Sequence, residues 1–170
     1  MSVVVLVGNP RPRSRTHEAA HLVAEALTGR QPDVAVDLAD LGAALFDPDD
    51  PRVAEAVEAV QGASLLVVAS PTYKATYTGL LKLFLDRLGP GALAGVTAVP
   101  LLLGGHWRHS LAADLLLKPV LVELGASVPT RGLFLLDSDY TVSEELEKWV
   151  TTARPQVTAA LGVEPVRVTA

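Results

Sequence analysis

The fold is decided by residues 64–88, which read Ser64-Leu65-Leu66-Val67-Val68-Ala69, then Ser70-Pro71-Thr72-Tyr73-Lys74-Ala75-Thr76-Tyr77-Thr78-Gly79, then Leu80 to Leu88. The opening apolar run has the length and branching of a buried parallel strand. In the last part, leucines and Phe84 recur at helical spacing with charged residues between them. The stretch therefore predicts a strand, a polar loop and a helix. In an open α/β sheet, such loops at the carboxyl ends of strands bind ligands.

The polar loop offers a proline, two tyrosines, a lysine, several hydroxyls and a glycine. Backbone N–H and C=O groups beside an aromatic face suit a flat ligand with polar edges. The same residue types are common in turns. On these residues alone, an ordinary turn in which Tyr73 only packs is an equal alternative.

Composition narrows the class of protein. With 170 residues, of which 49% are hydrophobic, the chain is long enough for one well-buried domain and short for two. We expect a single domain over residues 1–161 and a loose tail over 162–170. A net charge of −5 argues against a nucleic-acid partner. The absence of cysteine excludes disulfides and thiolate metal sites.

Apolar patterning gives no sign of a membrane segment or a secretory signal. No apolar run approaches the length that spans a bilayer. The three arginines of the first loop follow the first apolar run, whereas a secretory signal places its basic region before that run. We therefore expect a cytoplasmic protein with no membrane partner.

The first loop has the character of a phosphate site. Val3 to Val7 predicts a buried strand, and it is followed by Gly8-Asn9-Pro10-Arg11-Pro12-Arg13-Ser14-Arg15-Thr16 and a helix from about His17 to Thr28. Free N–H groups, the positive end of the helix dipole and arginine charge all favour an anion there. The loop lacks both the Walker ending and the Gly-x-Gly-x-x-Gly pattern. The alternative is that Ser14 or Thr16 serves only as a helix cap.

His17-Glu18-Ala19-Ala20-His21 matches the His-Glu-x-x-His pattern of zinc proteases. On a helical projection both histidines fall with the charged residues, away from the face of Ala19, Leu22, Val23, Ala26 and Leu27. A zinc protease uses this helix to line its cleft and needs a third ligand. A solvated helix face is therefore the better interpretation, and we predict no metal site.

Further strands are predicted at 34–38, 96–103 and 128–136, the last weakened at its start by Pro129 and Gly132. Helices are predicted around 53–60, at 110–124 and after 143. Pro119 has no N–H to offer the carbonyl of Leu115, so we expect a kink or one widened turn near Leu115. The surplus of leucines on this helix indicates either a subunit interface or deep burial within the domain.

Alternating strands and helices predict a doubly wound parallel sheet with helices on both faces and the flavodoxin-like order 2-1-3-4-5. In that order the first loop, the loop after residue 70 and the Gly104-Gly105-His106 turn meet at one edge of the sheet. A phosphate pocket would then lie beside a flat slot with an aromatic residue nearby. Such an arrangement fits flavin mononucleotide (FMN).

At these residues the sequence resembles the NADPH-dependent FMN reductase family, most closely the flavin reductases of the alkanesulfonate-monooxygenase type. The resemblance covers roughly residues 1–136 and rests on Gly8-Asn9-Pro10-Arg11 with Ser14-Arg15-Thr16, on Ser70 to Lys82, on Gly104-Gly105 and on Leu117-Lys118-Pro119-Val120-Leu121. It implies FMN phosphate at Ser14, Arg15 and Thr16, and the isoalloxazine ring against Pro71 to Lys74 and Gly104 to His106. The predicted cofactor-binding residues are Asn9, Arg11, Ser14, Arg15, Thr16, Pro71, Thr72, Tyr73, Lys74, Gly104, Gly105 and His106.

The resemblance also implies an activity: hydride transfer from NADPH, or NADH, to FMN. Because this chemistry belongs to the cofactors, we expect no catalytic side chain in the strict sense. The implied partners are further copies of the chain, as a dimer or tetramer, and a flavin-dependent monooxygenase that takes reduced flavin.

Two departures from the family pattern leave alternatives open. Asn9 stands where a serine is common, and Asp114-Leu115 lacks the aromatic residue or histidine often found after that aspartate. FMN is therefore either a released substrate or a retained prosthetic group, and the enzymatic rival is an FMN-bound quinone or azo reductase. The rival from another class is a flavodoxin-like electron carrier, which the arginines of the first loop fit poorly. A phospho-acceptor signalling domain lacks its acidic cluster here.

Overall fold

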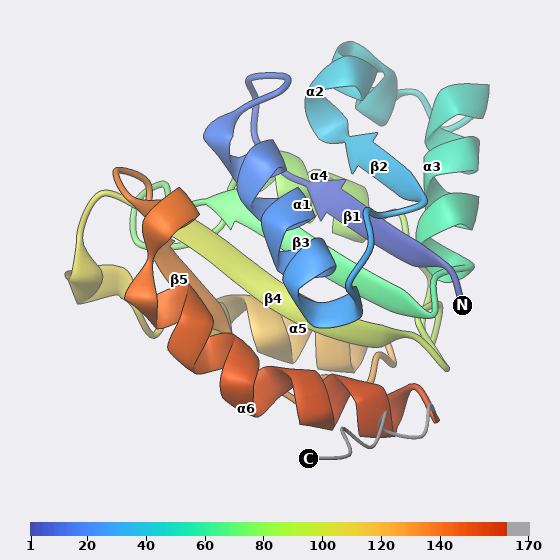
Figure 1. Ribbon diagram of the computed structural model, residues 1–170. Helices are drawn as coiled ribbons and strands as arrows, with labels where there is room; N and C mark the ends of the chain where they lie inside the picture. The colour runs from blue at the N-terminus through green and yellow to red at the C-terminus, as the bar shows by residue number, and fades with distance from the viewer. Residues whose placement is uncertain (163–170) are drawn as a thin grey trace.

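Five parallel strands form one sheet in a computed structural model that describes residues 1–162 (Figure 1). The strands are β1 (Val3–Val7), β2 (Val34–Asp37), β3 (Leu65–Pro71), β4 (Thr97–Gly104) and β5 (Leu133–Leu136). Their order is β2-β1-β3-β4-β5, with every neighbouring pair parallel. The predicted flavodoxin-like order is confirmed. Most of the predicted tail, residues 163–170, lies outside the described residues.

Helices cover both faces of the sheet, which explains why β1 is buried along its whole length. The α-helices are α1 (Arg15–Thr28), α2 (Leu38–Leu41), α3 (Pro51–Gln61), α4 (Gly79–Leu85), α5 (Lys118–Glu123) and α6 (Glu144–Ala160). Short 3-10 helices occupy Gly42–Phe46, Trp107–His109 and Tyr140–Val142. One apolar core packs α1 and α6 on one face, and a second packs α3, α4 and α5 on the other.

The packed face of α1 differs from the predicted one. Ala20 and Ala24 are fully buried together with Ala19 and Val23. Leu22 and Ala26, which the projection placed on that face, are only half-buried. The buried arc is therefore rotated toward small residues, which let the helix lie close to the sheet.

The helix after β4 contains the widened turn that Pro119 predicts. Ala113–Leu117 is π-helical, and the N–H of Lys118 donates to the carbonyl of Ala113, five residues earlier. Pro119 then follows as an early residue of α5, where a missing N–H has little cost. The expectation near Leu115 is confirmed.

Strand β5 begins later than predicted, at Leu133 instead of residue 128. Pro129 has no N–H for a ladder. Side chains from the π-helical turn and α5 then take the next backbone groups: Lys118 Nζ donates to the carbonyl of Thr130 (2.7 Å), and Asp114 Oδ1 accepts from the N–H of Gly132 (2.6 Å). Strand pairing with β4 resumes only where these contacts end.

Strand β2 ends one residue earlier than predicted, because Asp37 caps α2 by accepting from the N–H of Ala39.

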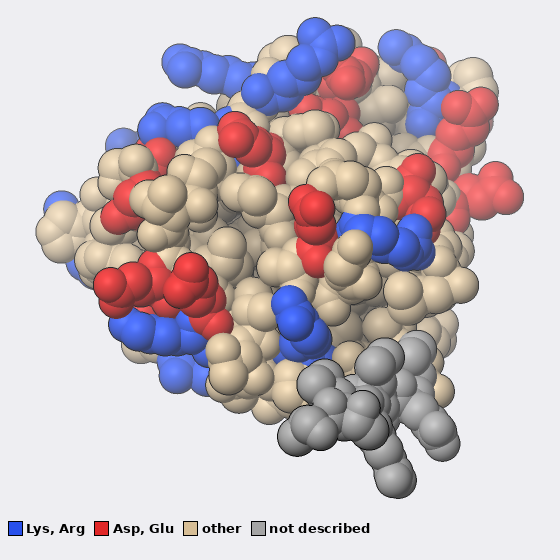
Figure 2. Space-filling view, viewed as in Figure 1, with Lys and Arg blue, Asp and Glu red and all other residues tan. Residues whose placement is uncertain are grey.

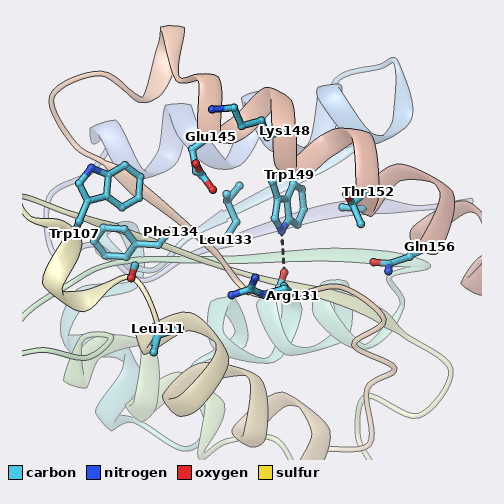
Figure 3. A pocket seen from close by; sticks show the side chains of 13 residues that line it. Trp107, Leu111, Arg131, Leu133, Phe134, Glu145, Lys148, Trp149, Thr152 and Gln156 are labelled. Atoms are coloured by element: carbon cyan, nitrogen blue, oxygen red, sulfur yellow. Dashed lines mark hydrogen bonds between the residues drawn. The ribbon is translucent and has the colours of Figure 1, made fainter.

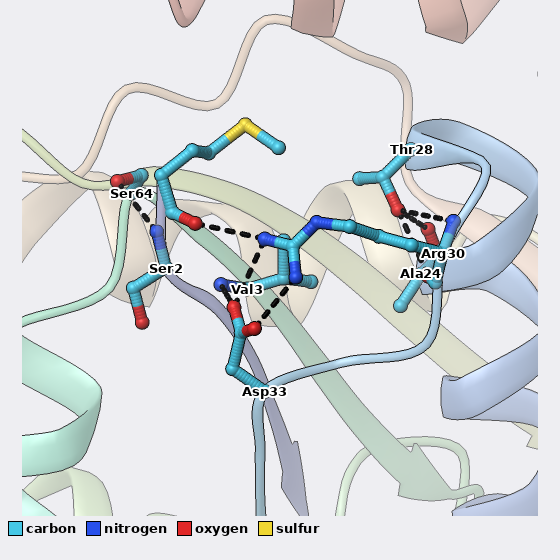
Figure 4. Close-up of polar contacts among 8 residues, drawn as sticks. Ser2, Val3, Ala24, Thr28, Arg30, Asp33 and Ser64 are labelled. Carbon is cyan, nitrogen blue, oxygen red and sulfur yellow. Dashed lines mark hydrogen bonds and ion pairs between the residues drawn. The ribbon is translucent and has the colours of Figure 1, made fainter.

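The amino end of β1 is fixed by a polar cluster at the opposite edge of the sheet from the loops described below (Figure 4). Asp33 accepts from the N–H of Val3 (2.7 Å) and pairs with Arg30 (2.6 Å). Arg30 also donates to the carbonyl of Met1, and the N–H of Ser2 donates to Ser64. These contacts join β1 to the segment before β2 and to the start of β3.

Within residues 1–162, no helix combines the length and the apolar character required to cross a membrane.

Candidate flavin site

Three loops meet at the carboxyl edge of the sheet and enclose a cavity of about 420 Å³. They follow β1, β3 and β4, and the first residue after β5 completes the wall. The lining residues are Asn9, Arg11, Pro12, Arg13, Ser14, Arg15, Thr16, Pro71, Thr72, Tyr73, Leu103, Gly104, Gly105 and Asp137. This is the switch-point edge at which the predicted topology places a ligand.

The first loop is held rigid by its own side chains. Asn9 Nδ2 donates to the buried Thr16 Oγ1 (2.9 Å), and Asn9 Oδ1 accepts from the N–H of Arg11 (2.9 Å). Arg13 has a positive φ of 49°, and its N–H donates to the buried Asp37 (3.0 Å). Asn9 therefore bridges both ends of the loop, a contact for which an amide is suited and a serine is too short.

The loop delivers the start of α1 to the cavity. Ser14 caps the helix by accepting from the N–H of His17 (3.3 Å). The N–H groups of Arg15 and Thr16 precede the first intrahelical bond and have no acceptor within residues 1–162. The arginines of this loop are exposed, and Figure 2 shows Lys and Arg side chains gathered over this part of the molecule. Free N–H groups and positive charge at a helix start are features that suit an anion.

The second loop is tied to the first by a buried threonine. Thr78 Oγ1 donates to the carbonyl of Gly8 (2.6 Å) and accepts from the N–H of Leu81 (3.1 Å), so it caps α4 as well. Its own N–H donates to Ser70 Oγ (3.0 Å). Sequence reasoning did not single out Thr78, although its position before an apolar helical run is the signal of a cap.

A two-residue turn presents Tyr73 at the mouth of the cavity. Tyr73 and Thr76 exchange backbone hydrogen bonds of 2.8 and 3.2 Å. The two residues between them, Lys74 and Ala75, have positive φ angles of 51° and 71°. Neither is a glycine, so the turn is held in a conformation that L-residues rarely adopt. Tyr73 is half exposed.

Gly104 and Thr72 form the floor between the second and third loops. A Cβ on Gly104 would lie 2.8 Å from Cζ of Phe134 and 3.2 Å from Thr72 Oγ1, so no side chain fits there. The Thr72 N–H donates to the carbonyl of Leu103 (2.6 Å). Thr72 Oγ1 is buried and has no hydrogen-bond partner within the described chain. Buried hydroxyls are normally paired, so this atom is suited to a polar ligand edge. A flat heteroaromatic ring over a glycine floor fits these groups.

Of the twelve predicted binding residues, ten line this cavity, and Lys74 and His106 lie outside its lining. Lys74 belongs to the strained turn, and His106 caps the next 3-10 helix by accepting from the N–H of Arg108 (3.1 Å). The cavity adds Asp137, which sequence reasoning missed. Its signal was available: it is the first polar residue after a buried strand, at the same edge as the other loops.

The zinc-protease pattern does not assemble a metal site in the described part of the chain, which contains no group of three or more candidate metal-ligating side chains. The rings of His17 and His21 lie 4.5 Å apart, and His21 Nδ1 is 3.2 Å from Gln31 Oε1. Burial first, and then the neighbouring His21, lowers the pKa of His17 below its ordinary value.

A larger cavity, of about 780 Å³, lies between α6, β5 and the Trp107 segment (Figure 3). Trp107 packs on Phe134 with ring centroids 5.6 Å apart, and Trp149 Nε1 donates to the carbonyl of Arg131 (2.9 Å). None of the twelve predicted residues lines it. The smaller cavity has the chemistry of a nucleotide site, because it alone of the two includes the start of α1 and the ends of β3 and β4.

Fold and site together define a flavodoxin-like α/β protein whose sheet edge presents the start of α1, with its free N–H groups and arginines, beside a slot floored by Gly104. The sequence profile of the NADPH-dependent FMN reductase family matches residues 1–141. The chain belongs to that family, which makes it an oxidoreductase that uses FMN with NADPH or NADH.

Individual relatives agree with this assignment. An FMN reductase (NADPH) of Escherichia coli K12 is 38% identical over 146 residues, 81% of this chain and 74% of its own. An NADH-dependent FMN reductase, SfnF, of Pseudomonas fluorescens Pf0-1 is 30% identical over 95% of this chain and 92% of its own. The solved apo structure of an NADH:FMN oxidoreductase, EMOB, has a TM-score of 0.83 at 34% identity, covering 99% of this chain and 92% of the other. An archaeal flavodoxin, at 15% identity and a TM-score of 0.63, shares the fold.

Proposed function

We propose that FMN binds in the three-loop cavity and is reduced there by a nicotinamide dinucleotide that stacks on its ring. The observation that carries this proposal is the convergence of an anion-binding helix start with a floor that excludes side chains at Gly104. The helix start would bind the phosphate of FMN. The floor at Gly104 would let the flavin ring lie flat against the backbone, with its other face open to the nicotinamide.

The residues divide into a phosphate end and a ring end. Ser14, Arg15 and Thr16 would hold the phosphate, with Arg11 at the rim and Asn9 supporting the loop. Pro71, Thr72 and Tyr73 would meet the ring on one side, with Gly104 and Gly105 below it. Lys74 and His106 remain predicted contacts that lie outside the lining.

Bound FMN supplies the hydride-accepting chemistry. The protein orients the two rings and keeps water out, so we propose that no side chain acts as acid or base. Thr72 Oγ1 would donate a hydrogen bond to the ring edge and so fix its position. Relatives are named for NADPH and for NADH, so the donor preference is best measured with both.

The proposal extends to the location, the oligomeric state and the partner of the protein. We propose a cytoplasmic homo-oligomer, a dimer or tetramer, that passes reduced FMN to a flavin-dependent monooxygenase. Exposed leucines on the π-helical segment support self-association, with Leu115 65% and Leu116 42% exposed. Two relatives from Pseudomonas putida, SfnF and SfnE, are named NADH-dependent FMN reductases.

One experiment separates this function from its rivals: stopped-flow oxidation of NADPH and NADH with and without added FMN, together with the flavin content of the purified protein. Rapid turnover that requires added FMN supports the proposal. Tightly bound flavin with quinone turnover supports the quinone or azo reductase. Flavin binding without consumption of either nicotinamide supports the electron carrier.

A further inference from the structure

Asp137 is fixed at the wall of the flavin cavity. It is the first residue after β5, and its N–H donates to the carbonyl of Gly104 (3.1 Å), which extends the sheet by one rung. Its side chain is 38% exposed, and the residue lines the same cavity as the start of α1. Tyr140, three residues on, donates to Glu18 of α1 (2.7 Å) and so holds this segment against the helix.

The carboxylate of Asp137 engages the arginine that the proposed function assigns to phosphate. Arg15 Nη1 donates to the carbonyl of Asp137 (2.7 Å), and Arg15 Nη2 lies 3.3 Å from Asp137 Oδ2. The pair crosses from the start of α1 to the end of β5, over 122 residues of sequence. The arginine side chain is 61% exposed, and ion pairs of this kind are weak enough to rearrange.

A phosphate at the start of α1 and the Asp137 carboxylate would both attract Arg15. They would also repel each other, because both are negative and belong to one cavity wall. The other groups at the phosphate end, the free N–H groups of Arg15 and Thr16, carry no such competitor. Among the residues that line the cavity within residues 1–162, Asp137 is the one with an acidic side chain.

We propose that Asp137 lowers the affinity of the site for the phosphate of FMN, so that FMN binds as an exchangeable substrate and is not retained as a prosthetic group. The inference rests on the proposed function and concerns the same site. The opposite arrangement, in which Asp137 orients Arg15 for phosphate, would give the reverse effect on affinity.

The test compares FMN with riboflavin, which has the same ring and no phosphate. Dissociation constants are measured by quenching of flavin fluorescence at fixed ionic strength, for the wild-type chain, for Asp137→Asn and for Asp137→Ser, which keeps the backbone contacts. We expect each variant to bind FMN about five- to tenfold more tightly and to release it more slowly in stopped-flow displacement. Riboflavin affinity should change by less than about twofold.

Two controls isolate the cause. Asp139→Asn removes the same charge two residues away, from an exposed side chain outside the cavity lining, and should leave both affinities unchanged. In an Arg15→Gln background, Asp137→Asn should give a smaller gain for FMN, because the competition for the guanidinium is gone. Thermal unfolding without flavin confirms that each variant is folded, and the serine variant replaces the asparagine one if only it folds.

The outcomes separate the inference from the proposed function. If the wild-type chain binds FMN better than riboflavin but Asp137→Asn binds FMN equally or more weakly, the inference is wrong and the function stands. If riboflavin gains as much as FMN, the effect is not on phosphate and the inference is also wrong. If the wild-type chain binds neither flavin, both are overturned.

Discussion

Single hydroxyl groups hold the loops of the three-loop cavity together, and Thr78 is the clearest case. It is 4% exposed, and its Oγ1 donates to Gly8 of one loop while capping the helix that follows the other. Replacing it with valine keeps the shape but leaves a buried carbonyl and a helix N–H unpaired. We expect Thr78→Val to lower the free energy of unfolding by about 2 kcal/mol. Urea unfolding measures this loss, and Thr78→Ser should recover most of it. A valine variant as stable as the wild type would show that the loops do not depend on this contact.

Asp33 gives the fold a defined sensitivity to acid. The hydrogen bond from Arg30, followed by that from the N–H of Val3, lowers the pKa of Asp33 from 3.8 to about 2. Because the folded-state pKa is depressed, the stabilisation is complete above about pH 4 and is lost as pH falls from there toward 2.

We expect Asp33→Asn to be less stable than the wild type at pH 7, with a difference that shrinks as the pH falls toward 2. Urea unfolding at several pH values measures it. Asp49→Asn, an exposed carboxylate with no ion pair in residues 1–162, should show no such pH-dependent difference. A difference for Asp33→Asn that stayed constant down to pH 2 would contradict the assignment.

At the scale of elements, the turn between Tyr73 and Thr76 stores strain beside the site. Ala75 adopts a φ of 71°, where glycine is favoured over an L-residue by about 1 kcal/mol. We expect Ala75→Gly to raise the free energy of unfolding by up to that amount, and Ala75→Val to lower it. Chemical denaturation measures both. Opposite signs would confirm a left-handed turn, whereas destabilisation by glycine would show that the backbone is extended in solution.

Some helices and strands could be predicted from the sequence alone, whereas others depend on contacts between separate segments. Patterns within one segment were sufficient for β1, β3, β4 and the widened turn before Pro119, because burial on both faces and a missing N–H act locally. The sequence predicted that the last strand would be weak at its start, but not that β5 would begin only at Leu133. That boundary depends on Asp114 and Lys118, which lie in the preceding helical segment and take the backbone groups of Gly132 and Thr130. The same holds in the site: the loops were predicted from their composition, but the contact of Asp137 with Arg15 depends on how the start of α1 packs against the end of β5, 122 residues away in the sequence.

At the scale of the whole molecule, the two faces of the sheet differ in what they leave exposed. α1 and α6 cover one face with largely polar outer surfaces. On the other, the stretch from Leu111 through the π-helical turn to the end of α5 exposes Leu111, Leu115, Leu116 and Val122, at 53%, 65%, 42% and 52%. Groups of exposed apolar side chains mark surfaces that associate. The widened turn contributes by carrying Leu115 and Leu116 outward while Leu117 stays fully buried.

This surface is the interface that we expect for the proposed homo-oligomer. We expect Leu116→Glu to dissociate the native assembly into smaller species without unfolding the chain, because the side chain has no part in the core and a charge resists desolvation in an interface. Sedimentation velocity measures the size, and circular dichroism the fold. Phe46→Glu is the matched control: Phe46 is 77% exposed but stands alone beside α2, so the assembly should survive its replacement. If the wild-type chain sediments as a monomer, or if only Phe46→Glu dissociates it, the leucine surface of the π-helical segment is not the interface.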